Sequence, residues 1–345
     1  MNILPLVTVI VPCRNEEKFI AKCLASIIAL DYPRESLEVI VVDGLSNDST
    51  RCIIYDFVKS HNFVKLFDNP NRVTPFALNI GIKNATGEFV VWMSAHNEYS
   101  RDHIRKCIKY MREFNADAVG GVIRTIPRVD TFIGRVICNV LSHKFGVGDS
   151  SHKIGSTNPV WADTAFGVCY KRELFDKVGL FNERLSRGQD MEFAMRLKRA
   201  GYKTLLCPDI VSFYYARSDL KSFIRHNFLN GIWAIYPFKL SKYIPVSFRH
   251  LVPLFFVLTL MILFILTVIA AILGLASLAV VISILLFFVC AAYLILAIYY
   301  SMQNAIKYAA LGYLFAMPLI FLVLHLSYGL GSFWGLVTLW RLKIH

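Results

Sequence analysis

Two long uncharged apolar runs near the C-terminus constrain this chain most. Residues 251–273 and 275–300 contain no charged side chain, and each is long enough to cross a bilayer, which takes about 20 apolar residues. Helices of soluble proteins rarely lack charge on every face. We therefore expect a membrane protein whose C-terminal part spans the bilayer.

A third apolar run makes the number of spans ambiguous. It begins near Tyr308, continues to Trp340, and is interrupted by Pro318, His325 and several glycines. It is too long for one simple helix. We expect about three spans, and a re-entrant or interfacial helix within the third run is the alternative.

The distribution of charge bears on the orientation in the membrane. All 24 acidic residues lie at or before Asp219, whereas eight of the 37 Lys and Arg residues follow it. Lys239, Lys242 and Arg249 flank the first run, so the positive-inside rule places the N-terminal part in the cytoplasm. Arg341 and Lys343 also favour the cytoplasm, which requires an even number of crossings. Three is the count by length alone, and the sequence leaves the number of crossings open.

The N-terminal part carries the signs of a cytosolic domain. Its first residues lack the basic start and the long apolar run of a signal peptide. The eight cysteines show no C-x-x-C pair, so we expect reduced, mostly buried thiols. The net charge is basic, but no stacking platform or basic stripe indicates nucleic-acid binding.

Strands and helices alternate over the first hundred residues. Four β-branched or apolar runs predict strands at 7–12, 37–44, 63–69 and 88–93. Helical patterns predict helices at 16–29, from about 48 onward, and at 75–84. Strands connected by helices indicate βαβ units and a mostly parallel sheet that is covered on both faces.

Three polar clusters follow three of these strands directly. They are "PCRNE" (12–16), "DGLSNDS" (43–49) and "SAHNE" (94–98). In open α/β sheets, ligands bind at the carboxyl ends of the strands, so the clusters are expected to converge on one cleft. The chain contains neither a dinucleotide-binding glycine fingerprint nor a P-loop.

Four segments together carry a family resemblance. They are "VTVIVPCRNEEKFIAKCLASI", "VIVVDGLSNDST", "ALNIGIKNATGEFVVWMSAHNEY" and "GLFNERLSRGQDMEFAMRLKRAGYK". In order and spacing, the chain resembles the family 2 inverting glycosyltransferases of GT-A fold. Within that family, the combination of "DGLSNDST", "FGVGDSSHKIG", "DTAFGVCYKREL" and an apolar tail ending "HLSYGLGSFWG" is similar to the membrane-anchored succinoglycan (exopolysaccharide) type. The resemblance implies an α/β, Rossmann-like GT-A domain over 1–217. Amphipathic interfacial helices are expected over 218–248 and transmembrane α-helices over 249–345.

The resemblance also implies which residues hold the nucleotide-sugar donor. These positions match Pro12, Arg14, Glu16, Asp43, Ser94 and Ala95. Two alternatives follow from the residues themselves. Asp48 is equally suited to capping the helix that follows it, and Arg14 is also able to pair with a neighbouring acid.

Inversion at an anomeric carbon needs one base to take the proton of the acceptor hydroxyl, and a carboxylate is suited to that role. Asp190 in "RGQDMEF" occupies the position of the family's catalytic base. Capping of a helix over 191–200 is its alternative role. Glu192, two residues further on, is expected to point elsewhere on the helix.

The departing nucleoside diphosphate develops negative charge that Mg²⁺ or Mn²⁺ neutralises. The family supplies the metal through an Asp-x-Asp motif, and this chain has Ser94, Ala95 and His96 at those positions. We expect His96 and Glu98 to bind a divalent cation weakly. The alternative is that His96 is only a polar loop residue.

The acceptor side is expected to include Gln189, Asp163 and Trp233, together with "FGVGDSSHK" (145–153). Residues 218–245 place apolar side chains at helical spacing among basic ones, which predicts an amphipathic helix at the headgroup level. Trp233 alone remains of the Gln-x-x-Arg-Trp motif of processive synthases, which disfavours long-chain synthesis.

The expected protein is a hexosyltransferase and a multi-pass protein of the cytoplasmic membrane. It transfers one sugar, with inversion, from a nucleotide-diphosphate sugar to a polyprenyl (di)phosphate-linked glycan at the cytoplasmic face. Transfer to polyprenyl phosphate itself is the alternative reaction. A catalytically degenerate membrane scaffold is the alternative of another class, because Ser94 replaces an acid. The donor base, the sugar, the linkage and the oligomeric state carry no signature in the sequence.

Overall fold

The computed structural model describes residues 4–242 and 246–342 and divides into two compact units. The first unit runs to Ile126 and takes in Ser150–Tyr215 and the short segment that begins at Ser241. The second unit comprises Pro127–Asp149, Ala216–Leu240 and the chain from Val246 onward. The expected boundary at residue 217 stays a prediction. Each unit is described by itself.

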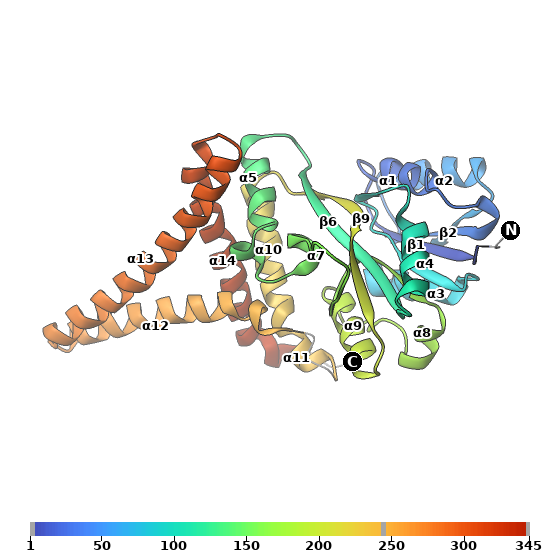
Figure 1. Ribbon diagram of the computed structural model, residues 1–345. Coiled ribbons are helices and arrows are strands. Elements are labelled where there is room, and N and C mark those ends of the chain that lie inside the picture. Colours follow the sequence, from blue (N-terminus) through green and yellow to red (C-terminus); the bar gives the residue numbers. More distant parts are fainter. Residues whose placement is uncertain (1–3, 243–245, 343–345) are drawn as a thin grey trace. The chain divides into compact units, whose positions relative to one another are not determined.

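The first unit is built on a nine-stranded sheet in the order β3-β2-β1-β4-β8-β6-β9-β5, with β7 paired to β9 (Figure 1). The strands are β1 (Val7–Cys13), β2 (Leu37–Asp43), β3 (Val64–Asp68), β4 (Phe89–Trp92), β5 (Asn97–Tyr99), β6 (Ala118–Pro127), β7 (Val160–Trp161), β8 (Phe166–Lys171) and β9 (Thr204–Ala216). The four predicted strands correspond to β1, β2, β3 and β4, and these four pair in parallel. Beyond β4 the pairing is antiparallel, so the complete sheet is mixed.

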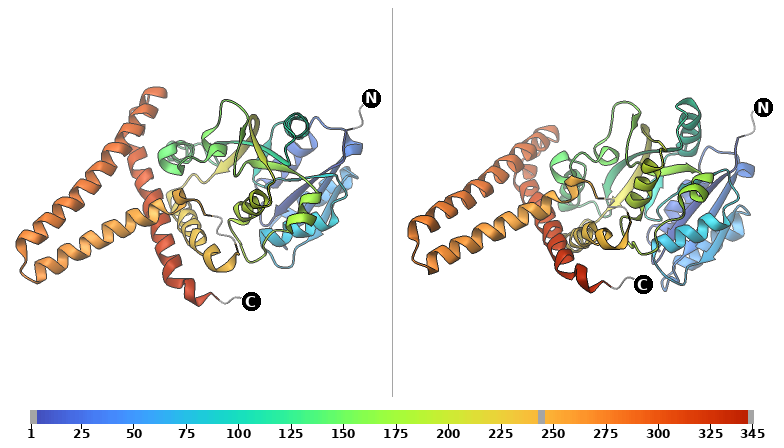
Figure 2. Two further views of the ribbon diagram at one scale, coloured as in Figure 1. Left: turned by 60° about the horizontal axis from the view of Figure 1, so that its bottom comes forward. Right: turned by 90° about the horizontal axis from the view of Figure 1, so that it is seen from below.

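Helices cover both faces of this sheet (Figures 1 and 2). The helices of this unit are α1 (Ile20–Ile28), α2 (Thr50–Ser60), α3 (Thr74–Asn84), α4 (His103–Glu113), α7 (Ser151–Ile154), α8 (Glu173–Val178) and α9 (Gln189–Arg199). One apolar core joins the strands to α1, α2 and α4, and the other joins them to α3, α8 and α9. Strands buried on both faces read as continuous apolar runs, which is why β1 and β2 were recognisable from sequence. The eight cysteines, all within the described residues, are free, and six of them are buried.

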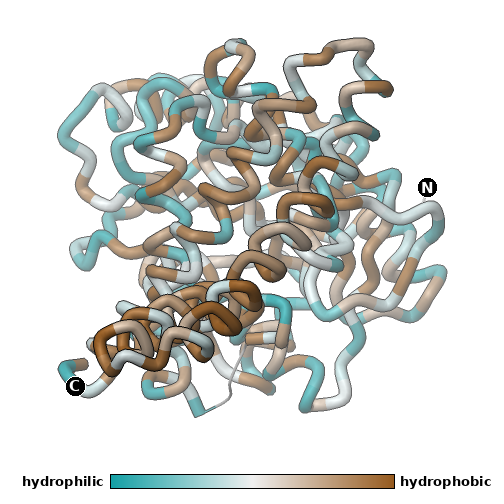
Figure 3. Tube along the Cα trace, turned by 90° about the vertical axis from the view of Figure 1, so that its left-hand side faces the viewer, coloured by the Kyte–Doolittle hydropathy of each residue, from teal (hydrophilic) through white to brown (hydrophobic). Residues whose placement is uncertain are grey.

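The second unit is helical and strongly apolar (Figure 3). Its helices are α5 (Phe132–Leu141), α6 (Lys144–Val147), α10 (Leu220–Ile235), α11 (Pro237–Leu240), α12 (Val252–Ile272), α13 (Ala276–Lys307) and α14 (Gly312–Thr338). Among the described residues, three helices are long and apolar enough to cross a membrane: Val252–Ile272, Ala276–Lys307 and Gly312–Arg341. The expected fold class is therefore confirmed. Lys343, which entered the prediction of an even number of crossings, lies outside the described residues.

The predicted amphipathic helix corresponds to α10, and it packs closely along α14. A Cβ atom added to Gly231 would lie 2.0 Å from the carbonyl oxygen of Tyr328, and one added to Gly331 would lie 2.0 Å from that of Phe228. Small residues permit such close backbone approach between helices in membranes. Ser332 strengthens the contact, because its hydroxyl donates to the carbonyl of Gly231 at 3.2 Å.

A buried carboxylate ties the amino ends of the parallel strands together. Glu38 on β2 accepts hydrogen bonds from the hydroxyl of Thr8 on β1 (2.6 Å), from Lys65 on β3 (2.8 Å), and from the backbone N–H of Thr86 (2.9 Å). Burial opposes ionisation of Glu38, but these donors outweigh it and lower the pKa of the carboxyl. Glu38 thus links three strands and the loop that enters β4.

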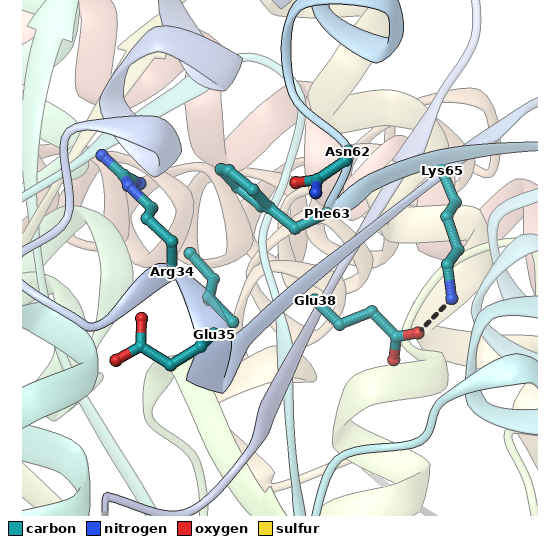
Figure 4. A pocket seen from close by; sticks show the side chains of 7 residues that line it. Arg34, Glu35, Glu38, Asn62, Phe63 and Lys65 are labelled. Atoms are coloured by element: carbon teal, nitrogen blue, oxygen red, sulfur yellow. Dashed lines mark hydrogen bonds and ion pairs between the residues drawn. The ribbon is translucent and has the colours of Figure 1, made fainter.

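A shallow pocket lies beside this carboxylate, where Figure 4 shows the Glu38–Lys65 ion pair. Its other lining residues include Arg34, Glu35 and Phe63, which precede β2 and β3 in the chain. It therefore lies at the amino ends of these strands, whereas ligands of open α/β sheets bind at the carboxyl ends. We do not assign the pocket to the active site.

We predict that Glu38→Gln lowers the free energy of unfolding by about 1–3 kcal/mol, because buried donors lose their charged acceptor. A native pKa below that of the unfolded chain stabilises the fold fully above pH ~4.3 and loses that effect as the pH falls through the native pKa. The difference between wild type and variant should therefore shrink on acidification. Thermal unfolding in detergent at several pH values measures it. Glu35→Gln, at an exposed position of the same pocket, is the matched control and should change little.

Candidate active site

The loops that follow β1 and β2 interlock at the carboxyl ends of these strands. The N–H of Gly44 donates to the carbonyl of Cys13 at 2.8 Å, the N–H of Asn15 donates to the hydroxyl of Ser46 at 2.9 Å, and the N–H of Asn47 donates to the Asn15 side chain at 3.0 Å. Asn15 has a positive φ of 53°, a conformation that Asn tolerates better than most residues. Two of the predicted polar clusters therefore form one surface.

Asp43 is buried beneath this surface and holds the loop after β2 in position. Its side chain is 0% exposed and accepts hydrogen bonds from the N–H and the hydroxyl of Ser46. Arg51 donates to Asp43 at 2.9 Å and to Asp68 on β3 at 2.6 Å. A direct contact between Asp43 and a nucleotide base would have to displace one of these partners. Sequence reasoning missed Arg51, although it directly follows the motif "DGLSNDST".

The residues around the β1 loop are more accessible. Arg14 is exposed, and its aliphatic stem lies over Gly44, where an added Cβ atom would meet it at 3.2 Å. No ion pair of Arg14 occurs within the described residues, so the expected alternative of pairing with an acid is not seen. Pro12 is partly buried in register with Val42, and the N–H of Glu16 donates to the hydroxyl of Thr50 at 2.8 Å.

Asp48 serves the start of α2. Its carboxylate accepts from the N–H of Thr50 at 3.0 Å and from the N–H of Glu17 at 3.4 Å. The residue before the helix is Ser49, which makes no side-chain capping bond of its own. The helix-capping alternative for Asp48 therefore has direct geometric support, since a free backbone N–H of the first turn finds an acceptor there.

The third cluster, after β4, alternates in exposure. The side chains of Ser94, His96 and Glu98 are partly exposed, whereas those of the intervening Ala95 and Asn97 are buried. The side chain of Ala95 belongs to the apolar core, so only its backbone is available to a donor. Ala95 and His96 form a turn, closed by the N–H of Asn97 donating to the carbonyl of Ser94 at 3.2 Å, and the series leaves its three polar side chains accessible.

The two expected metal ligands have different partners. The Nδ1 atom of His96 lies 3.2 Å from a carboxylate oxygen of Glu16, which joins the third cluster to the first. Glu98 accepts a short hydrogen bond from the hydroxyl of Tyr215 on β9. The structure thus brings His96 together with Glu16, and the contact that it gives Glu98 is with Tyr215. The assignment of His96 and Glu98 as ligands stays a prediction.

The donor set can be tested against a divalent cation. Within residues 4–242 and 246–342, no group of three or more His, Cys, Asp or Glu side chains is placed to hold a metal ion. His96 and Glu16 nevertheless offer one imidazole nitrogen and one carboxylate side by side. Mg²⁺ sites often use one or two protein ligands and take the others from water and substrate phosphates. These residues fit a cation that arrives with a diphosphate.

Asp190 lies in the first turn of α9 and is exposed. The helix begins at Gln189 after Gly188, which is its N-cap residue. The protein packed around Asp190 raises the pKa of its carboxyl through desolvation, while hydrogen bonds from the backbone at Met191 and Asp190 and the charge of Lys153 act in the opposite direction. The alternative in which Asp190 binds free N–H groups of the first turn therefore has support, and it does not exclude a role as base. A raised pKa makes the carboxylate a stronger proton acceptor. Lys153, on α7, lies in a segment that the sequence assigned to the acceptor side.

Gln189 is the other polar residue at the start of α9. It is buried, and its side-chain oxygen has no hydrogen-bond partner in the described structure. Buried acceptors without partners are rare, because each costs desolvation energy. This oxygen is enclosed by protein, so the expected place of Gln189 on the acceptor side stays a prediction.

Asp163 and Trp233 lie elsewhere. Asp163 forms an exposed ion pair with Lys198 at 2.6 Å. Lys198 is eight residues along α9 from Asp190, or about 12 Å at 1.5 Å per residue, so Asp163 is anchored toward the opposite end of that helix. Trp233 belongs to α10 in the second unit, where its ring packs edge-on against Tyr236 at 5.3 Å. Their roles toward an acceptor remain predictions.

One arginine fixes α9 in place. Arg196 donates to both carboxylate oxygens of Glu192, and it also donates to the carbonyls of Val178, Gly179 and Leu180. The side chains of Arg196 and Glu192 are only 13% and 5% exposed. Glu192 thus points away from Asp190, as the sequence predicted, and it has a structural role.

We predict that Arg196→Ala lowers the free energy of unfolding of this domain by about 3–5 kcal/mol, because it leaves the buried charge of Glu192 uncompensated. Lys198→Ala, two residues away, removes an exposed ion pair and should cost less than about 1 kcal/mol. Thermal unfolding of both variants measures the difference. Equal losses would contradict the anchoring role of Arg196.

Comparisons with known proteins bear on the family of this chain. The family model described as "Glycosyl transferase family 2" matches residues 8–179. The dolichyl N-acetyl-alpha-D-glucosaminyl phosphate 3-beta-D-2,3-diacetamido-2,3-dideoxy-beta-D-glucuronosyltransferase of Methanococcus voltae is 33% identical over 234 residues, which cover 65% of this chain and 71% of that protein. The succinoglycan biosynthesis protein ExoA of Rhizobium meliloti is 25% identical over 260 residues, covering 70% of this chain and 77% of that protein.

A solved structure shares the fold. The mannosyltransferase PcManGT of Pyrobaculum calidifontis, solved with GDP-Man and Mn²⁺, aligns with a TM-score of 0.57 and 24% identity over 93% of this chain and 88% of that chain. At this identity the likeness shows the fold alone. On the sequence evidence of the family model and of a relative 33% identical over most of its length, this chain belongs to glycosyl transferase family 2.

Proposed function

We propose that this glycosyltransferase transfers a single sugar, with inversion, from a nucleotide-diphosphate sugar to a polyprenyl (di)phosphate-linked glycan at the cytoplasmic face of the membrane. One observation carries the proposal: Asp190, in the first turn of α9, presents an exposed carboxylate whose pKa is raised. A base is thus presented where a sugar hydroxyl can approach.

The chemistry follows from one displacement. Asp190 takes the proton of the acceptor hydroxyl while that oxygen attacks the anomeric carbon. The bond between this carbon and the donor diphosphate breaks, and its electron pair leaves with the nucleoside diphosphate. One in-line displacement inverts the anomeric configuration.

The leaving diphosphate needs positive charge near the β1 loop. The exposed Arg14 is suited to contact phosphate oxygens, and His96 with Glu16 is suited to hold a divalent cation. When bound, such a cation neutralises charge on the departing diphosphate. Asp43 and Arg51 hold the loop that carries these groups in position.

The lipid-linked acceptor is supported by two features. Within the part of the chain that the structure describes, three helices are long and apolar enough to span a membrane. The Methanococcus relative, by its name, acts on a dolichyl phosphate that already bears a sugar. We therefore favour a glycosylated lipid acceptor over polyprenyl phosphate itself, and assays with both acceptors distinguish the two reactions.

We predict that Asp190→Asn lowers turnover by about 100- to 10,000-fold, the range expected when a general base is lost. Binding of the donor, measured by calorimetry, should stay unchanged. The acid limb of the wild-type pH–rate profile should lie above the pKa of about 3.9 of an ordinary Asp, and it should be absent from the residual activity of the variant. Asp176→Asn, at an exposed position on α8, is the control. Substantial transfer by Asp190→Asn would exclude Asp190 as the base.

We predict that His96→Ala raises the Mn²⁺ concentration needed for half-maximal transfer at least tenfold, because one of few protein ligands is lost. The binding of Mn²⁺ in the presence of nucleoside diphosphate, measured by calorimetry, should weaken in parallel. Comparing Glu16→Gln with Glu98→Gln shows which of the two carboxylates binds the cation together with His96. A change with Glu98→Gln alone would favour the pair expected from sequence over the pair seen in the structure.

A further inference from the structure

The three apolar helices differ in how they are exposed. In their most apolar stretches, α12 and α13 bury only 11% and 6% of their residues, whereas α14 buries 44%. In α13 the first buried residue is Ala297, followed at helical spacing by Ser301 and Ala305. The part of α13 before Ala297 thus has no buried residue and is apolar on every face, as lipid-facing helices are, although Tyr293 stacks on Phe256 of α12 at 4.8 Å.

One side of α14 forms an apolar stripe that is exposed near the start and the end of the helix, while its other side packs against protein. Most of the exposed large apolar side chains recur every three or four residues. They are Leu311, which precedes the helix, and Phe315, Leu319, Leu330, Trp334, Leu336 and Val337. Near the end, Trp340 adds a second exposed indole ring. A stripe of this kind is typical of a helix that lies in a membrane interface, where indole rings are enriched.

Charged groups accompany α14 at both ends. At its start, an added Cβ atom at Gly312 would meet the ring of Phe132, and Arg135, one turn further along α5, forms an exposed ion pair with Asp130 at 2.7 Å. At its end, Lys239 donates to the carbonyls of Leu339, Trp340 and Leu342. Charges at both ends are compatible with a spanning helix and with an interfacial one.

Contacts at the middle of α14 distinguish a spanning helix from an interfacial one. The carbonyl of Pro253 lies against Gly329, where an added Cβ atom would meet it at 2.2 Å. Arg249 lies one turn before Pro253 and pairs with Asp149 at 2.9 Å, and the Asp149 side chain is 87% exposed. Gly329 is about 26 Å from the start of α14 and about 14 Å from its end, at 1.5 Å per residue. A transmembrane α14 would hold this open ion pair within the hydrocarbon, where charged side chains are costly.

The other two helices have the dimensions of a complete span. Residues 252–272 and 276–296 each extend about 31 Å as helix, and the hydrocarbon core of a bilayer is about 30 Å thick. In Figures 1 and 2, α12 leaves α14 crosswise from its middle, and α13 returns to its start. All eight Lys and Arg residues that follow Asp219 lie outside these two segments. The charge distribution therefore places both ends of the hairpin on one side.

We propose that α12 and residues 276–296 of α13 form a two-helix membrane hairpin, and that α14 lies in the plane of the membrane surface with its apolar stripe among lipid headgroups and upper acyl chains. The chain then crosses the bilayer twice, and its C-terminal residues lie on the same side as its N-terminal domain. The ion pair of Arg249 and Asp149 reaches water. This proposal concerns the second unit alone and does not depend on the proposed reaction.

Reporter fusions to the full chain test the topology. Green fluorescent protein folds in the cytoplasm, and alkaline phosphatase is active only outside it. A fluorescent protein at the C-terminus should fluoresce, phosphatase at the C-terminus should be inactive, and phosphatase inserted after Gly274 should be active. Active phosphatase at the C-terminus would overturn the proposal, because it requires a third crossing.

Matched lysine substitutions test the two kinds of helix. Ile262→Lys lies at the centre of α12 and Leu330→Lys lies near the centre of α14, and both wild-type side chains are exposed. A lysine at the centre of a spanning helix strongly disfavours insertion, so Ile262→Lys should reduce the membrane-inserted yield at least tenfold. Leu330→Lys should stay within twofold of wild type. Similar losses in both variants would overturn the interfacial placement.

Tryptophan fluorescence in vesicles gives a readout that does not depend on expression. Lipids brominated near the headgroup should quench wild-type fluorescence more than lipids brominated near the acyl-chain end, and Trp334→Phe should reduce that difference. Stronger quenching by the deep bromines would indicate a spanning α14. Absence of quenching by either lipid, together with a dimer in detergent, would assign the stripe to a second copy of the chain. Both results would overturn the proposal.

Discussion

The guanidinium of Arg196 holds the helix on which the proposed chemistry depends. It distributes its donors over one carboxylate and three consecutive carbonyls, so α9 is anchored to the turn that follows α8. A planar group with five N–H donors suits this task, because few other side chains satisfy so many acceptors at once. With α9 anchored, Asp190 and Gln189 in its first turn occupy defined positions. Precise placement of a base is worth more than its intrinsic strength.

The site divides its polar residues between support and chemistry. Asp43, Arg51 and Asp48 satisfy one another or backbone groups, and they hold the loops after β1 and β2 together. Arg14 and Asp190 are left exposed to a substrate. This division has a physical reason. A carboxylate whose acceptor positions are filled by protein donors holds the surrounding loops in place, but it has little capacity left to bind a substrate. Motifs that look equally functional in sequence thus have different roles in the structure.

The helices of the second unit associate for a different physical reason. They cannot gain from the hydrophobic effect inside a bilayer, so contact between them depends on close packing. Glycines on α10 and α14 provide this packing where the two helices meet. The same contact leaves only one side of α14 for lipid. A helix that is apolar enough to span can therefore be held at the surface by its protein neighbours.

Local patterns in the sequence were sufficient for the strands and helices. The apolar runs predicted β1, β2, β3 and β4, and the polar clusters predicted that the strand ends would meet. These features depend on neighbours close in the chain, so periodicity and turn chemistry reveal them. The same holds for Asp190, whose motif identified it and whose helix start placed it.

Long-range contacts decided the rest. His96 meets Glu16 across 80 residues, and Glu98 meets Tyr215 across 117 residues. The antiparallel half of the sheet and the burial of Asp43 likewise depend on partners that no local pattern specifies. The family, the order of elements and the apolar helices follow from the sequence alone. Which side chains share a contact, and how α14 is covered, became evident from the fold, because both depend on packing between segments that are distant in the chain.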